Sequence, residues 1–108
     1  MTITVGIGPL TVADVVAVAR DDAKIELCPD ALAQVALTRE HIDKLAESST
    51  PVYGISTGFG ALAKRHIPQD LRTQLQHSLV RSHAASSGEE VEREVIRALM
   101  LLRLSTLM

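Results

Sequence analysis

The stretch VIRALMLLRLSTLM, residues Val95–Met108, constrains the fold of this chain more than any other segment. Its only polar side chains are Arg97, Arg103, Ser105 and Thr106. A surface helix carries an apolar stripe opposite a polar face, whereas this segment is apolar on nearly every side. A chain of 108 residues has few elements with which to cover such a helix. We therefore expect it to pack against other subunits or against the remainder of a larger protein.

Length and composition indicate one small soluble domain over residues 1–108. The net charge of -2, from 11 basic and 13 acidic residues, does not favour nucleic-acid binding. Cys28 is the single cysteine, which excludes an internal disulfide and suits a reducing compartment. No signal peptide and no apolar run of about 18 residues is present, so we expect no membrane span. These features predict a cytoplasmic protein.

The N-terminal third predicts two strands around a helix. Thr2–Val5 and Lys24–Leu27 are short strand candidates. Thr11 and Asp14 have the spacing of a capping box, in which each side chain satisfies a backbone N–H of the other. The helix that they open should end near Asp21.

A second helix should begin at Pro29, because proline suits the first helical turn. It should end before Pro51, which disfavours helical angles at the residue that precedes it. Its expected buried side consists of Leu32, Val35, Ile42 and Leu45.

Two further helices are expected after residue 67. Pro68 marks the start of one, and Leu71, Leu75, Leu79 and His83 form a stripe on it at helical spacing. Ser87 and Glu90 have the spacing of another capping box, which predicts the start of the final helix. The fold class is therefore mainly α, with a minor two-strand element and one glycine-rich loop.

That loop, VYGISTGFG at residues 52–60, holds three of the six glycines and the only two aromatic rings, Tyr53 and Phe59. One interpretation is a tight connection between helices, with Tyr53 packed as an ordinary ring. Another is a phosphate-binding loop, because GFGALA at residues 58–63 fits the G-x-G-x-x-A pattern. The pattern lacks its context, since no strand precedes it and Pro68 limits a following helix.

A third interpretation comes from resemblance. PVYGISTGFGALAKRHI (residues 51–67) followed by LQHSLVRSHAA (residues 75–85) resembles the N-terminal part of the histidine ammonia-lyase family. That family is grouped with the phenylalanine and tyrosine ammonia-lyases and the aminomutases. The resemblance covers essentially the whole chain, and the combination of Y-G-x-x-T-G-F-G with a later S-H-A is specific.

The resemblance implies a reaction and three site residues. The family converts L-histidine to trans-urocanate and ammonia. Its catalytic tyrosine corresponds to Tyr53, and its substrate-binding histidine and glycine correspond to His83 and Gly60. A phenol acts as a base near neutral pH only where its surroundings favour the phenolate. For His83 the alternative is a core histidine that continues the leucine stripe.

One departure from the family pattern concerns the electrophile. The family makes a methylidene-imidazolone group from an internal Ala-Ser-Gly triplet, and this chain contains no such triplet. The nearest sequence, ASSG at residues 85–88, is interpreted as a turn. The resemblance therefore implies no cofactor in this chain, and we expect no activity from the 108 residues alone.

Several hypotheses follow. The leading one is a truncated, split or engineered N-terminal portion of a histidine ammonia-lyase. The full enzyme would act on a small-molecule amino acid substrate and work as a homo-oligomer or with a companion chain. The alternatives are a non-catalytic helical oligomerisation module of the same descent, and the same part of a tyrosine ammonia-lyase or aminomutase. We expect no metal site, because His41, His66, His77 and Cys28 lack ligand-like spacing.

Overall fold

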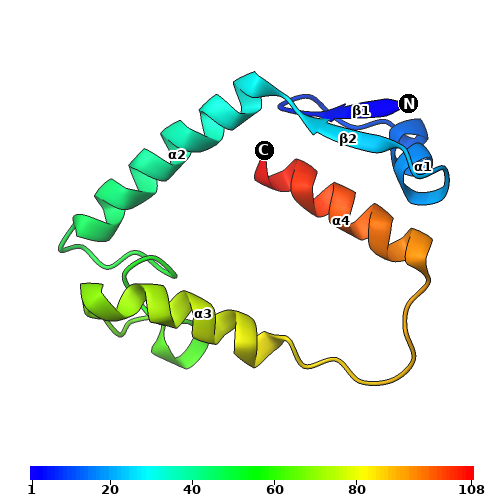
Figure 1. Cartoon of the computed structure of the whole chain (residues 1–108). Coiled ribbons are helices and arrows are strands. Elements are labelled where there is room, and N and C mark those ends of the chain that lie inside the picture. The colour runs from blue at the N-terminus through cyan, green and yellow to red at the C-terminus, as the bar shows by residue number, and fades with distance from the viewer. The chain divides into compact units, whose positions relative to one another are not determined.

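A computed structural model describes every residue from 1 to 108 (Figure 1). Contacts divide it into two compact units, Met1–Leu37 with Glu89–Met108, and Thr38–Gly88. The elements are β1 (Thr2–Val5), α1 (Val12–Arg20), β2 (Lys24–Leu27), α2 (Pro29–Glu47), the 3-10 turns η1 (Gly60–Leu62) and η2 (Gln69–Leu71), α3 (Arg72–His83) and α4 (Arg93–Leu107). The predicted class, mainly helical with two strands, is confirmed.

In the first unit, β1 and β2 form a parallel pair with Thr2 opposite Lys24 and Val5 opposite Leu27. Both strands have the predicted bounds. Parallel strands require a crossover connection, and α1 supplies it. Alternate residues of β1 point into the core, so Ile3 and Val5 are buried while Thr2 and Thr4 are exposed.

The core of this unit lies between β1, α1 and α4. α1 and α4 pack along each other. The buried cluster consists of Ile3, Val5, Ala17, Val18, Ala23 and Leu101, with Leu10, Val15, Leu104 and Met108 packed against it. Residues from both ends of the sequence therefore share one core.

The predicted capping box at the start of α1 is present. The Thr11 N–H donates to Asp14 Oδ2 at 2.8 Å, and the Asp14 N–H donates to Thr11 Oγ1 at 3.2 Å. The hydrogen bond from the Thr11 backbone is the main reason why the pKa of Asp14 lies below its ordinary value. The last residue of the helix is Arg20 and its C-cap is Asp21, near the expected end.

Charged side chains join the end of α1 to α4. Arg93 Nη2 lies 2.7 Å from Asp22 Oδ1, and Arg20 Nε lies 2.7 Å from Glu94 Oε2. Arg97 Nε donates to the carbonyl of Val18 at 2.8 Å, which satisfies one of the free carbonyls at the end of α1. These contacts fix the position of α4 along α1.

The predicted start of the final helix is wrong. α4 begins at Arg93, with Glu92 as its N-cap and no side-chain cap, so Ser87 and Glu90 do not form a capping box. Gly88, at φ +101°, turns the chain in a conformation that a helix does not contain. Residues 84–92 are exposed and lie outside any helix.

The expectation that α4 lacks cover is confirmed. Only Leu101 is buried on it, and Leu99, Met100 and Leu107 are each more than 60% exposed.

None of the helices combines the length and the apolar character needed to span a membrane.

α2 begins at Pro29 and ends at Glu47, in agreement with the expected bounds. The expected buried side is wrong for Leu32 and Val35, which are exposed, while Ile42 and Leu45 are half-buried. The physical reason is that α2 makes no extensive contact with any other helix or strand. Leu32 and Val35 are therefore left uncovered within these 108 residues.

Candidate functional site

The glycine-rich loop of the second unit is built on two buried hydroxyl residues. Ser56 and Thr57 are 0% and 1% exposed. Ser56 Oγ accepts the Val52 N–H at 2.9 Å, and Thr57 Oγ1 accepts the Gly54 N–H at 3.2 Å and donates to the Gly58 carbonyl at 3.0 Å. The loop is therefore folded around its own small polar side chains.

Backbone bonds tie this loop to the segment that follows it. The Gly58 N–H donates to the Arg65 carbonyl at 3.1 Å, and the Ile67 N–H donates to the Ser56 carbonyl at 2.9 Å. Thr57 and His66 form an isolated antiparallel bridge. Residues 56–67 thus close into a small loop of their own.

Side chains of α3 bond the loop and the segments on either side of it. Gln76 Nε2 donates to the Gly54 carbonyl at 3.1 Å. Arg72 donates through Nε to the Ile67 carbonyl at 3.0 Å and through Nη1 to the Ala46 carbonyl. The sequence interpretation missed Ser56, Thr57, Arg72 and Gln76, and only the hydroxyls in a glycine-rich turn carried a signal that pointed to them.

The two aromatic rings lie together on this support. Tyr53 and Phe59 have ring centroids 5.7 Å apart and an interplanar angle of 84°, an edge-to-face pair. Gly54 has φ +71°, and a Cβ there would lie 3.0 Å from Cε1 of Phe59. A glycine at position 54 therefore permits both the turn and the ring packing.

Tyr53 is presented outward. The residue is 61% exposed, and the Gly60 N–H faces the Tyr53 hydroxyl oxygen at 3.4 Å. Gly60 has φ +54°, and a Cβ built on it would meet no atom within 4 Å. The structure thus brings Tyr53 and Gly60 together, with open space beside them. Tyr53 is not packed as an ordinary buried ring.

His83 lies at the end of α3 and is exposed. Its Nδ1 lies 3.0 Å from the Leu79 carbonyl and 2.9 Å from Ser82 Oγ. The leucine stripe on α3 is only half-buried at Leu75 and Leu79. His83 is therefore not a core histidine in this structure. No hydrogen bond joins it to Tyr53 or Gly60.

The other chemical interpretations find no support in the geometry. Gly58 is not preceded by a strand, and the segment after it forms only the short turn η1 rather than a long helix. The dinucleotide pattern therefore lacks the strand and helix that it requires. No group of three or more His, Cys, Asp or Glu side chains is placed to hold a metal ion.

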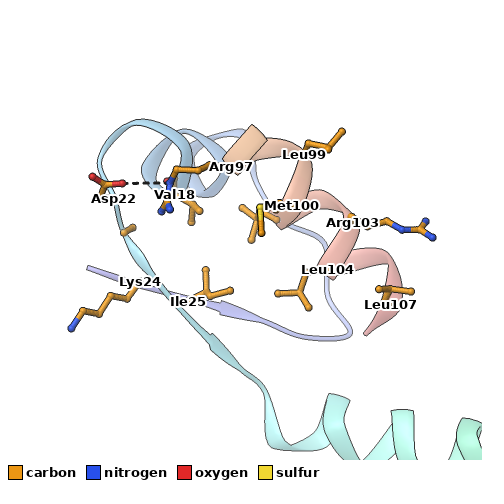
Figure 2. A pocket seen from close by; sticks show the side chains of 12 residues that line it. Val18, Asp22, Lys24, Ile25, Arg97, Leu99, Met100, Arg103, Leu104 and Leu107 are labelled. Atoms are coloured by element: carbon orange, nitrogen blue, oxygen red, sulfur yellow. Dashed lines mark hydrogen bonds and ion pairs between the residues drawn. The ribbon is translucent and has the colours of Figure 1, made fainter. Parts of the chain in front are cut away.

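The first unit contains a separate apolar groove of about 800 Å³ (Figure 2). In Figure 2 the side chains of Ile25, Met100 and Leu104 point toward one another across it, and Arg97 lies at one end near Asp22. None of Tyr53, Gly60 and His83 lines it. The groove is part of the incompletely covered surface of α4.

Comparisons with known proteins agree with the loop motif. The family model "Aromatic amino acid lyase" matches residues 10–108. The histidine ammonia-lyase of Streptomyces avermitilis is 58% identical over 105 residues, which are 97% of this chain and 20% of that protein. The tyrosine 2,3-aminomutase of Chondromyces crocatus is 42% identical over 99 residues, 92% of this chain and 19% of that protein.

Solved structures give the same result. The crystal structure of the tyrosine aminomutase from Streptomyces globisporus superposes with a TM-score of 0.91 at 32% identity, over 99% of this chain and 20% of that one. The chain thus spans about a fifth of the length of the proteins that it matches. It belongs to the aromatic amino acid lyase family.

Proposed function

We propose that residues 1–108 are one region, the N-terminal portion of a histidine ammonia-lyase. The complete enzyme would convert L-histidine to trans-urocanate and ammonia, in the cytoplasm and as an oligomer. The identity of 58% to a histidine ammonia-lyase supports this substrate over the others of the family. The incompletely covered α4 fits a piece that packs against more protein.

One observation supports the proposed role of Tyr53: its phenol is exposed, while the backbone of its loop is hydrogen-bonded to the buried hydroxyls of Ser56 and Thr57. A general base must reach its proton in a fixed geometry, and this arrangement combines access with position. In the complete enzyme Tyr53 would accept the β-proton of the amino acid. The Gly60 N–H faces the same oxygen and adds a donor beside it.

Gly60 and His83 are proposed to bind the substrate. A side chain at position 60 would occupy the open space beside the Tyr53 hydroxyl. The ring of His83 is anchored through Nδ1, which leaves Nε2 for a ligand. Both roles concern an amino acid, and neither requires a metal.

The methylidene-imidazolone group of the family does not fit these residues. The chain has no Ala-Ser-Gly triplet, and Ser86, Ser87 and Gly88 lie in an exposed segment outside any helix or strand. A buried, constrained site for cyclisation is absent there. The precursor of the group would have to come from protein outside residues 1–108.

The test compares two preparations. A complete enzyme that carries this N-terminal sequence should form urocanate from L-histidine and should leave L-tyrosine unchanged. The 108-residue chain alone should form no urocanate and show no near-ultraviolet absorbance of a methylidene-imidazolone group, since a phenol and an imidazole do not replace a covalent electrophile. Turnover by the homogeneous short chain would refute this assignment.

A second candidate has a specific observation in its favour. Tyrosine aminomutases match this chain at 42% identity in sequence and 0.91 in TM-score. Conversion of L-tyrosine by the complete enzyme, with no urocanate from L-histidine, would replace the proposed substrate by this one. A complete protein that turns over neither amino acid would favour the non-catalytic module.

A further inference from the structure

The residues on either side of Tyr53 are both held by buried hydroxyls. The Val52 N–H donates to Ser56 Oγ at 2.9 Å, and the Gly54 N–H donates to Thr57 Oγ1 at 3.2 Å. Neither Ser56 nor Thr57 is accessible to solvent beyond 1%. Because both neighbours of Tyr53 are fixed, the direction in which its side chain leaves the backbone is fixed as well.

The Thr57 hydroxyl also links the two halves of the loop. It accepts from Gly54, next to Tyr53, and donates to the carbonyl of Gly58, next to Phe59. Phe59 is the ring partner of Tyr53, and Gly60 faces its hydroxyl. One oxygen atom thereby joins the backbone next to Tyr53 to the backbone next to Phe59.

The Tyr53 side chain has little else to hold it. It is mostly exposed and contacts the edge or face of one ring and one backbone N–H. A valine at position 57 would fill nearly the same volume but could neither accept nor donate a hydrogen bond. The hydrogen bonds of the Thr57 hydroxyl therefore fix the backbone next to Tyr53, and packing alone would not do so.

We propose that the buried hydroxyls of Ser56 and Thr57, the hydroxyl clamp, are positioning residues that hold the Tyr53 phenol in its catalytic place. This inference rests on the proposed function, in which Tyr53 is the base. The clamp acts through the backbone of residues 52, 54 and 58, to which its hydroxyls are hydrogen-bonded.

The experiment uses the complete enzyme with Thr57→Val, Thr57→Ser, Ser56→Ala and Tyr53→Phe. Thr57→Val and Ser56→Ala should each lower kcat by at least about tenfold, because small displacements of a catalytic group carry losses of this order. KM should change little. Thr57→Ser keeps the hydroxyl and should keep most of the rate.

Double variants separate positioning from a general structural effect. If the clamp acts through Tyr53, adding Thr57→Val to Tyr53→Phe should cause no further loss of kcat. Additive losses would overturn the inference, as would a folded Thr57→Val enzyme with the wild-type kcat. Where Thr57→Val does not fold, Ser56→Ala carries the same cycle, and if neither folds the hydroxyls are structural and the inference is wrong.

Failure of the two proposals can be told apart. A folded Tyr53→Phe enzyme with the wild-type rate would remove Tyr53 as the base and the clamp with it, whereas a complete enzyme that forms no urocanate would overturn the proposed function itself. An impaired Tyr53→Phe enzyme beside an unimpaired Thr57→Val enzyme would leave the base in place and overturn the clamp alone. Thermal melts on every preparation report whether a variant is folded.

Discussion

Single residues in the loop show how two glycines with similar backbone angles serve different purposes. Gly54 and Gly60 have φ +71° and +54°. Alanine at either position costs about 1–2 kcal/mol of backbone strain. At Gly54 the new Cβ would also lie 3.0 Å from the ring of Phe59, whereas at Gly60 it would meet nothing within 4 Å.

We therefore expect Gly54→Ala to lower the melting temperature of the 108-residue chain more than Gly60→Ala does. In the complete enzyme Gly60→Ala should raise KM, because the added methyl group occupies the proposed substrate space. Melts of both variants and steady-state kinetics of Gly60→Ala are the measurements. Equal melting temperatures would show that the Phe59 contact has no energetic weight.

Residue-level features were predictable from sequence where they are local. Thr11 and Asp14 lie three positions apart, so their capping box could be predicted from spacing. The hydrogen bonds of Ser56 and Thr57 are equally local, and the hydroxyls in a glycine-rich turn were their only signal in the sequence. The Gln76–Gly54 contact joins residues 22 positions apart, and no periodicity encodes it. The role of Tyr53 came from the motif, and it stays a proposal together with those of Gly60 and His83.

Among the elements, the packing of α4 on α1 decides the stability of the first unit. Leu101 is 2% exposed in the core, while its neighbour Leu102 is 49% exposed. Leu101→Ala should cost about 2–5 kcal/mol, the usual range for a buried leucine. Leu102→Ala is the matched control and should cost less than about 1 kcal/mol. Denaturant unfolding of the two variants gives the comparison, and equal losses would place Leu101 outside the core.

The link between Asp22 and α4 should depend on pH. The hydrogen bond from Arg93 is the main reason why the pKa of Asp22 lies below its ordinary value, with the charges of Arg93 and Arg97 adding to it. A lowered folded-state pKa gives stability that is present above the ordinary Asp pKa of about 4 and is lost as pH falls below it.

Asp22→Asn should therefore lower the melting temperature at neutral pH, and the difference from wild type should vanish in acid. Asparagine tolerates the left-handed backbone angle of this position, φ +55°, so the change removes the charge with little strain. Asp21→Asn is the control, since Asp21 forms no ion pair. A difference that persists unchanged below about pH 3 would contradict the ion-pair account.

At this scale the sequence predicted the bounds of both strands, α1 and α2, because caps, prolines and alternation are local signals. It did not predict the start of α4, where the Ser87–Glu90 spacing competes with the turn at Gly88. The prediction of the buried side of α2 was also wrong. Burial requires a neighbouring element, and the apolar pattern of a helix does not show where that element lies.

On the scale of the whole molecule, the exposed apolar surface should determine how the isolated chain behaves in solution. Leu99, Met100 and Leu107 on α4 are more than 60% exposed, and the groove beside them is lined mainly by apolar side chains. Such surface usually marks an interface or an aggregation site. We expect the isolated chain to self-associate or to bind an apolar dye, as seen by native mass and dye fluorescence. A monomer at high concentration that binds no dye would contradict this.

The central claim is that the loop of residues 52–60 carries the base of an ammonia-lyase, and Tyr53→Phe in the complete enzyme tests it most directly. The change removes one oxygen and keeps the ring that packs against Phe59. Loss of a general base should reduce kcat by roughly 10²- to 10⁴-fold. Ser78→Ala, which removes an exposed hydroxyl from α3, is the control and should keep its rate. A folded Tyr53→Phe enzyme with the wild-type kcat and an unchanged melting temperature would contradict the claim.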